Sequence, residues 1–464
     1  MDSFLHYIKE CVDIFKKNLS NEPVRILGHL DCDGICSGAI LIKSFYRENI
    51  KTVYSSHKQV DEKVILELKR EPYKILFFVD FGSNVLEYIN KHLADKIVFI
   101  LDHHKFMDLE TKHFNVNQNK FNLDDNILCG SGISYLFAKY LNLRNKDLAY
   151  LALIGMVGDN QDKNPSEINK KIINEAIDSG EIDVKVGLSF FGSQTKPLHK
   201  LIEYSTDIFI PGVTGSEAGA INFLQNLGID LKDSNGEFKK IFDLNKDEMN
   251  KLITAIILSR IGSQADPENI LGNIYTLRNE LNGEPTKDIK EFSTLLNACG
   301  RLNKISFGVG TCLKDLNSKQ KSFELLKKYK TELINSLNWI EANKKSNFII
   351  EREKLVIINA QNNIRDTIIG TVNSVLTRSG LYKNGTMVVS MAYTPDKNIK
   401  ISLRNVENGL VDLSKFIQEI CTNFGGFGGG HPNASGGLIP LNKENEFIEC
   451  LIQKFDKIVV KQNV

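Results

Sequence analysis

Eight acidic and imidazole side chains lie in four short segments within the first 160 residues. They are His29, Asp31, Asp33, Asp80, Asp102, His103, His104 and Asp159. So many carboxylates in one crevice would repel one another unless a cation held them together. Oxygen and imidazole ligands without thiolate suit manganese, magnesium or zinc, and the excess of carboxylates favours manganese, with magnesium as the other candidate. The residue types alone therefore point to a divalent metal centre.

The elements around these residues would bring them together. Three of the segments, GHLDCDG, VDFGSN and LDHH, end apolar runs of β-forming residues, and the fourth, GDN, ends an apolar helical pattern. The apolar runs alternate with helical patterns, which predicts βαβ units and a parallel sheet. The carboxyl ends of parallel strands meet at one edge, where ligands bind. If the first strand stays extended, His29, Asp31 and Asp33 also share one face, because β side chains alternate.

Each segment also has an ordinary explanation when it is taken alone. A single aspartate after a strand, such as Asp80, is usually a helix cap, and the pair Asp33-Gly34 is usually a turn. The shared position and shared chemistry make separate coincidences a poor explanation of the whole set. Two ions that share a bridging aspartate would use these groups together, and such a pair can stabilise the attacking and leaving oxygens at phosphorus.

The rest of the chain is predicted to complete an α/β protein. We expect a parallel-sheet domain over residues 1–188, a mostly helical insertion over 189–305, a connecting long helix over 306–346 and a smaller α/β domain over 347–464. Apolar residues at spacings of three, four and seven predict the long helix: Phe323, Leu326, Leu333, Leu337 and Ile340. The last domain contains a glycine-dense segment, GGFGGGHPNASGG, which is expected to be a loop.

Composition places limits on compartment and partners. The 464 residues carry a formal net charge of +1, so any attraction for a polyanion must come from a local arrangement of charges. The eight cysteines are scattered, and the N-terminus has no apolar signal segment, which predicts reduced thiols and a cytoplasmic protein. No apolar run approaches the length of about 20 residues that spans a bilayer, so no membrane association is expected.

The motifs resemble those of a known family. In their order along the chain, GHLDCDG, VDFGS, LDHH and GDN resemble the four motifs of the DHH phosphoesterase superfamily. The segment GGGHPNASGG resembles the signature of the DHH-associated C-terminal domain. The segment LLNACGR, the two-lobed layout and the insertion are most similar to the archaeal RecJ-like exonucleases, which resemble the nuclease associated with the replicative helicase factor GINS.

The resemblance implies a role for each candidate residue. One manganese ion would be held by His29, Asp31 and Asp80, and the other by Asp33, Asp80, His103 and Asp159, so that Asp80 bridges the two. His104 would face the phosphate, and Asp102 would orient an imidazole. Nucleotide phosphate and sugar would be bound by Arg404, Gly428, Gly429, Gly430 and His431. The family's usual alanine pair reads Ala434-Ser435 here, a departure that bears on substrate choice.

The implied function is that of a manganese-dependent exonuclease. It would hydrolyse single-stranded DNA or RNA to mononucleotides, in DNA replication or repair. Two alternatives stay open: a phosphodiesterase for oligoribonucleotides or cyclic dinucleotides, and a replisome-associated scaffold. The large insertion suits a long polymer or a protein partner such as GINS. A purely structural role would leave the costly cluster of carboxylates unexplained.

Overall fold

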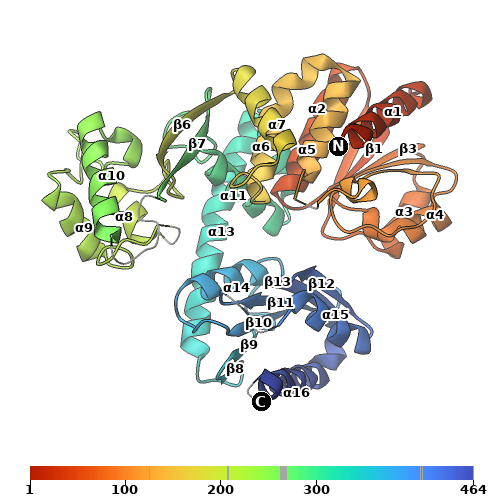
Figure 1. Cartoon of the computed structure of the whole chain (residues 1–464). Helices are drawn as coiled ribbons and strands as arrows, with labels where there is room; N and C mark the ends of the chain where they lie inside the picture. The colour runs from red at the N-terminus through yellow and green to blue at the C-terminus, as the bar shows by residue number, and fades with distance from the viewer. Residues whose placement is uncertain (125, 206–207, 262–268, 408, 410, 463–464) are drawn as a thin grey trace. The chain divides into compact units, whose positions relative to one another are not determined.

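The computed structural model describes residues 1–124, 126–205, 208–261, 269–407, 409 and 411–462. The chain divides into two compact units, Met1–Leu326 and Lys327–Val464, and each is described by itself. Figure 1 shows the elements of both units in their order along the chain.

The first unit is built on a five-stranded sheet in which all neighbouring strands are parallel, with the order β2-β1-β3-β4-β5. The strands are β1 (Val24–His29), β2 (Thr52–His57), β3 (Ile75–Val79), β4 (Ile97–Leu101) and β5 (Phe114–Val116). The order reverses direction between β1 and β3. In a doubly wound sheet such a switch point opens a crevice at the carboxyl ends of the strands. The predicted fold class is confirmed for this part of the chain.

Helices cover both faces of this sheet. On one face α3 (Glu62–Arg70) and α4 (Leu86–His92) pack on Leu76 and Phe78. On the other face an aromatic core joins the sheet to three helices, α1 (Asp2–Asn18), α2 (Cys32–Arg47) and α5 (Gly130–Leu141). Phe77 and Phe99 stack at 4.8 Å there, and Phe15 and Phe137 contact them edge-on. Both faces are buried at the centre of the sheet, which explains why β3 and β4 are apolar at every position.

The rest of the first unit is largely helical. Its elements are η1 (Ser83–Val85), η2 (Gln118–Phe121), η3 (Leu143–Leu148), α6 (Ala149–Gly158), α7 (Glu167–Asp178), β6 (Ile182–Leu188), α8 (Leu198–Glu203), α9 (Glu217–Asn226), η4 (Ile241–Asp243), α10 (Lys246–Arg260), β7 (Leu271–Leu277), α11 (Ile289–Arg301) and α12 (Ile305–Cys312). Strands β6 and β7 pair antiparallel, and α8, α9 and α10 share one apolar core. Between residues 209 and 229 only α9 is helical, and Gly212 and Gly215 before it have positive φ.

The predicted connecting helix is α13 (Leu316–Asn343), which spans the division between the two units. Its buried positions include Leu326 and Ile340, as the spacing predicted. The shorter helix α12 precedes it as a separate element.

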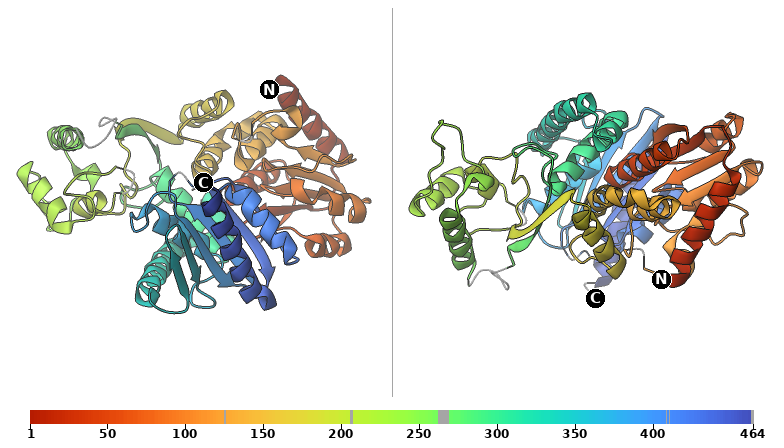
Figure 2. Two further views of the ribbon diagram at one scale, coloured as in Figure 1. Left: turned by 60° about the horizontal axis from the view of Figure 1, so that its bottom comes forward. Right: turned by 90° about the horizontal axis from the view of Figure 1, so that it is seen from above.

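The second unit contains a six-stranded mixed sheet of order β12-β13-β11-β10-β9-β8. Its elements are β8 (Ile349–Arg352), β9 (Leu355–Asn359), α14 (Ile369–Arg378), β10 (Met387–Tyr393), β11 (Asn398–Asn405), α15 (Leu413–Asn423), β12 (Phe427–His431), β13 (Ala434–Pro440), η5 (Leu441–Lys443) and α16 (Glu444–Gln462). One face of the sheet packs on α15 and α16. The left view of Figure 2 shows these two blue helices lying along the strands.

The expectation of a loop at the glycine-dense segment was wrong. Residues Phe427–His431 form the edge strand β12, which pairs antiparallel with β13. Glycine has low β propensity, so the local sequence does not predict this strand. Hydrogen bonding to β13 stabilises it instead. No helix among the described residues is both long and apolar enough to cross a membrane, and all eight cysteines are free thiols.

Candidate active site

The first segment changes from strand to helix within the motif. His29 is the last residue of β1, Asp31 is the N-cap of α2, and Asp33 lies in the first turn of that helix. Asp31 caps the helix by accepting a hydrogen bond of 3.1 Å from the backbone N–H of Gly34. The expectation that all three residues share the face of one extended strand was therefore wrong. The helical turn, rather than β alternation, places Asp33.

Asp80 follows β3 in an unusual backbone conformation. Its φ is +64°, in the left-handed region that residues other than glycine, asparagine and aspartate seldom adopt. Its N–H donates to the carbonyl of Leu101 at 2.9 Å, so the neighbouring strand holds it there. The carboxyl group is 2% exposed. Backbone strain of this kind is concentrated at functional sites, and the simple cap reading of Asp80 does not apply.

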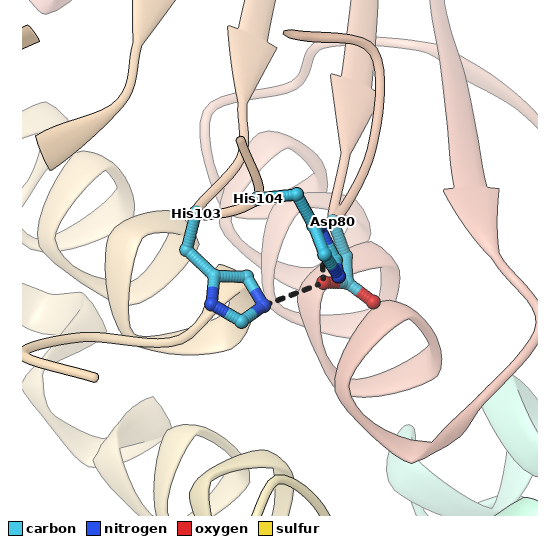
Figure 3. A group of neighbouring side chains, drawn as sticks. All are labelled: Asp80, His103 and His104. Carbon is cyan, nitrogen blue, oxygen red and sulfur yellow. Dashed lines mark ion pairs between the residues drawn. The ribbon is translucent and has the colours of Figure 1, made fainter. Parts of the chain in front are cut away.

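The segment after β4 carries three of the candidates. The carboxylate of Asp102 accepts hydrogen bonds from the backbone N–H groups of Ser83, His103 and His104, at 3.0, 2.8 and 3.2 Å. The same carboxylate accepts a bond of 2.8 Å from Nδ1 of His104. Asp102 therefore orients the imidazole of His104. Figure 3 shows both histidine rings turned toward Asp80.

Asp159 is the C-cap of α6. A carboxylate at this end of a helix faces the negative pole of the helix dipole, which is unfavourable without a nearby cation. The ring of His103 approaches it, with Nε2 at 3.2 Å from Oδ2 of Asp159.

These side chains converge on a small volume at the switch point of the sheet. Nδ1 of His29 lies 2.9 Å from Asp31 and 3.1 Å from Asp80, and Nε2 of His103 lies 3.4 Å from Asp80. Three groups have ligand atoms within 4.8 Å of one another: His29, Asp31 and Asp80; Asp33, His103 and Asp159; and Asp80, His103 and His104. Asp80 contributes to two of these groups, so it lies between the pair His29 and Asp31 and the pair His103 and His104.

Two buried atoms in this cluster lack hydrogen-bond partners. They are Oδ2 of Asp33 and Nε2 of His103. Nε2 of His103 is close to two carboxylates, but no contact has the alignment of a hydrogen bond. Buried polar atoms without partners are costly and rare in native proteins. Atoms that converge without bonding one another fit a divalent cation that takes oxygen and imidazole ligands.

The protonation of the cluster reflects its crowding. Burial, with Asp80 and Asp159 nearby, raises the pKa of Asp33 well above its usual range. Burial raises the pKa of Asp159 to about 7, although His103 opposes the shift. Burial would lower the pKa of His103, but Asp80 and Asp159 outweigh it and raise that pKa well above the ordinary value. Without a cation, protons therefore neutralise the site.

Binding of Mn²⁺ should release protons and tighten as pH rises. The metal competes with the proton on Asp159, whose pKa is about 7, and that competition disappears above neutrality. We expect the affinity to increase at least about tenfold between pH 6 and 8. Isothermal titration calorimetry in two buffers of different ionisation enthalpy counts the protons. An affinity that does not depend on pH would contradict the arrangement.

Small residues make room for the carboxylates, and sequence reasoning missed them. A Cβ atom on Gly155 would lie 2.5 Å from Oδ1 of Asp33, and one on Gly130 would lie 2.8 Å from the Cβ of Asp80. The backbone N–H of Ser131 donates to Asp33 at 3.0 Å. The segments CGSG and LIGMVGDN contain these glycines, but only the fold reveals what they approach.

Helix α11 supports the site from behind. The side-chain oxygen of Asn297 accepts a hydrogen bond of 3.1 Å from the N–H of Cys32, next to Asp31. A Cβ on Gly300 would lie 1.8 Å from the carbonyl oxygen of Leu30, so this helix and the β1–α2 connection pack backbone to backbone. These contacts give the segment LLNACGR a structural role at the site.

The predicted nucleotide-binding residues lie together in the second unit. Gly428, Gly429, Gly430 and His431 form most of β12, and Arg404 lies on β11. Arg404 and His431 both face Ala434 of β13, one from each side. Arg404 donates to the hydroxyl of Ser374 at 3.2 Å and to the carbonyl of Leu403 at 2.7 Å. No described contact tests a role in nucleotide binding, which stays a prediction.

Comparison with protein families supports the assignment over most of the chain. The DHH family N-terminal domain matches residues 23–156, the DHH-CID domain matches 190–272 and the DHHA1 domain matches 353–457. An uncharacterized protein of Methanocaldococcus jannaschii is 30% identical over 99% of this chain and 98% of its own length. The chain belongs to the DHH family. The three matched domains follow one another along the chain in the order DHH, DHH-CID and DHHA1.

Solved structures share this DHH fold. RecJ from Thermus thermophilus in complex with Mn²⁺ has a TM-score of 0.57 at 14% identity, and the match covers 96% of this chain but 54% of that one. An exonuclease RecJ bound to manganese has the same score and identity and is covered over 93% of its length. CDC45 from Entamoeba histolytica has a TM-score of 0.65 at 12% identity, with 97% and 99% covered.

The family and the geometry agree on the kind of site. This DHH protein has the ligand cluster of a metal-dependent phosphodiesterase, with buried carboxylates and imidazoles at the carboxyl edge of its parallel sheet. The number and identity of the ions belong to the proposal that follows.

Proposed function

We propose that the protein is an exonuclease that hydrolyses phosphodiester bonds of single-stranded DNA or RNA and releases mononucleotides. It would use two Mn²⁺ ions, with Mg²⁺ as a substitute, and act in DNA replication or repair. One ion is assigned to His29, Asp31 and Asp80, and the other to Asp33, Asp80, His103 and Asp159. The bridging role falls to Asp80.

The single observation that carries the proposal is the complete ligand cluster with unsatisfied buried atoms. Asp33 and His103, which belong to one group of potential ligands, each have a buried atom without a hydrogen-bond partner. A protein that had only a structural role would lose stability by keeping such atoms. The RecJ-like architecture over most of the chain supports nucleic acid as the substrate class.

When bound, the two ions would supply the positive charge that polarises the phosphoryl group. The protein adds a hydrogen-bonding group of its own. In the metal-free site Asp102 raises the pKa of His104 to about 9 against the effect of burial, which favours the protonated imidazole. The side chain of His104 is 54% exposed. Asp102 fixes its position by accepting hydrogen bonds from Nδ1 and from the backbone N–H of His104. His104 is thus able to donate a hydrogen bond to a phosphoryl oxygen whose charge grows in the transition state.

Replacing His104 by alanine should separate catalysis from metal binding. Loss of one preorganised donor to the transition state typically costs about 10²–10³ in kcat. We expect a fall of that size in His104→Ala, with the affinity for Mn²⁺ nearly unchanged, because Asp80 and His103 keep their other contacts. Steady-state kinetics and calorimetry on the same preparation measure both. Loss of metal binding in step with activity would make His104 a ligand instead.

The activity assay uses single-stranded DNA and RNA labelled at either end, with Mn²⁺ or with a chelator. We expect labelled mononucleotide from one end only, and no product with chelator. Product formation in chelator would remove the metal from the reaction. Cleavage of cyclic dinucleotides or short oligoribonucleotides, but not of longer strands, would favour the phosphodiesterase alternative.

The similarity to CDC45 leaves a replisome-associated scaffold as the second candidate function. The intact ligand cluster is the feature that favours catalysis over this alternative. Tight Mn²⁺ binding without hydrolysis of any phosphodiester would favour the scaffold.

A protein partner is proposed for the insertion. Leu258 and Ile261, at the end of α10, are apolar side chains three residues apart that are 62% and 61% exposed. We assign this region to a partner such as GINS. Co-elution of the full-length chain with GINS in size-exclusion chromatography tests the assignment, and separate elution at micromolar concentration would oppose it.

A further inference from the structure

Part of the sheet of the second unit is left open on one face. Residues paired across neighbouring strands point to the same face, so Phe427 shares a face with Leu438, Gly429 with Gly436, and His431 with Ala434. The same face continues onto β11 through the pairs Leu438–Lys400 and Ala434–Arg404. We call this surface, over Phe427, Gly429, His431, Gly436 and Arg404, the glycine platform.

The opposite face of these strands is covered. A Cβ on Gly428 would lie 3.0 Å from the carbonyl oxygen of Ile417 in α15, so that side of β12 packs directly on the helix. Along β13 the residues alternate between buried Ser435, Gly437 and Ile439 and partly exposed neighbours. The glycine platform is therefore the accessible side of the sheet at this edge.

The middle of the glycine platform consists of the paired residues Gly429 and Gly436. A Cβ on Gly429 would meet no atom within 4 Å, whereas the ammonium of Lys400 lies 3.4 Å from the Cβ position of Gly436. Phe427 and His431 lie on either side of Gly429, four residues apart, which corresponds to about 13 Å along a strand. A flat group could lie on the open backbone of Gly429 between these two rings.

Phe427 does not pack in the core of the second unit. It is 53% exposed, and no other large apolar side chain in the described strands of this unit is exposed. A single exposed aromatic residue is ordinary on a protein surface. This one shares its face with the guanidinium of Arg404 and with the ammonium of Lys400, which lies 3.4 Å from the Cβ position of Gly436. An exposed ring beside cations suits a ligand that combines an aromatic plane with an anion.

We propose that Phe427 is a base-stacking residue that receives a nucleobase of the single-stranded substrate on the glycine platform. The inference deepens the proposed function, because it assigns to one strand both the phosphate-binding glycines and the support for the base. Every base has a π-face, so stacking on Phe427 would bind all four bases. The result would be an enzyme with a requirement for a base but with little preference among bases.

A tryptophan at position 427 tests the stacking without relying on hydrolysis. The chain has one tryptophan, Trp339. In a Trp339→Phe background, Phe427→Trp makes the ring the only tryptophan fluorophore, and stacking of a base quenches it. We expect saturable quenching by dAMP and by dTMP, and none by deoxyribose 5-phosphate at equal concentration. Tyr46→Trp, at a side chain that is 73% exposed in α2, serves as the control for collisional quenching.

The outcomes separate the two proposals. Quenching by nucleotides without hydrolysis of any strand would support the stacking role and defeat the exonuclease. Hydrolysis of single strands together with equal or absent quenching for nucleotides and deoxyribose 5-phosphate would overturn the stacking role alone.

Kinetics give a second measure of the same role. Phe427→Ala should raise KM for a single-stranded oligonucleotide about tenfold, while Phe427→Tyr should stay within about twofold of the wild type. With an oligonucleotide that lacks bases at its cleaved end, the wild type and Phe427→Ala should show the same KM. A difference that persists on the abasic oligonucleotide would assign Phe427 a role other than stacking.

Discussion

Replacing Asp80 by asparagine is expected to reduce phosphodiester hydrolysis at least about 10³-fold, which corresponds to about 4 kcal/mol of transition-state stabilisation. Asp80 is the one residue whose carboxylate approaches His29, His103 and His104. Asparagine has the same shape and tolerates the positive φ at this position, so the fold should survive. Hydrolysis of a labelled single strand in saturating Mn²⁺ measures the effect.

The same variant should also respond less to the metal. In the metal-free protein the carboxylate of Asp80 pairs with His29 and His103, at 3.1 and 3.4 Å, so its charge is already balanced there. We expect the increase in melting temperature that Mn²⁺ gives the wild type to shrink or vanish in Asp80→Asn, because the shared ligand is lost. Differential scanning fluorimetry with and without Mn²⁺ measures the increase in both proteins. Full activity in Asp80→Asn would end the two-ion proposal.

Gly300→Ala should cause the largest loss of stability among single-methyl substitutions at the site. The new Cβ would lie 1.8 Å from the carbonyl oxygen of Leu30, and a backbone atom has no rotamer that avoids it. The helix and the β1–α2 connection would have to separate by more than 1 Å. Overpacking of this kind costs about 3 kcal/mol. Denaturant unfolding monitored by circular dichroism measures the loss.

Activity should fall as well in Gly300→Ala, because the displaced connection carries Asp31. A misplacement of about 1 Å can cost about 10² in rate. Gly272→Ala is the matched control in the same unit, since its Cβ would meet the nearest atom, in Ser189, at an ordinary 3.4 Å. If Gly300→Ala unfolds like this control, the close packing of α11 on the site is wrong.

The parallel sheet and the ends of its strands could be predicted from the sequence, because apolar runs and helical patterns are local signals. The metal cluster followed because His29, Asp80 and His103 each come at or just after the end of a strand, and strand ends meet at one edge. The position of Asp33 could not be derived by alternation, because the chain enters a helix before reaching it. Strand pairing gave no local sign at β12, where three glycines favour a loop.

Contacts between distant segments could not be predicted from the sequence. Glycine is needed at positions 155 and 130 because Asp33 and Asp80, respectively, approach them, and the neighbouring residues in the sequence do not indicate these contacts. Asn297 lies in a segment quoted only for its resemblance, and its contact with the N–H of Cys32 gives it a physical role. The alternating exposure of β13 identified an open surface that composition alone does not indicate.

Strand β12 also bears on pairing between copies of this chain through the edge of the sheet. As the outer strand of its sheet it leaves a row of main-chain groups unpaired with any strand, which in other proteins templates fibrils and domain-swapped dimers. Glycine has low β propensity and offers no side chain for a dry zipper between molecules. The run Gly428–Gly430 thus leaves its main chain accessible to a small polar ligand. It remains a poor template for pairing with the same strand of a second molecule.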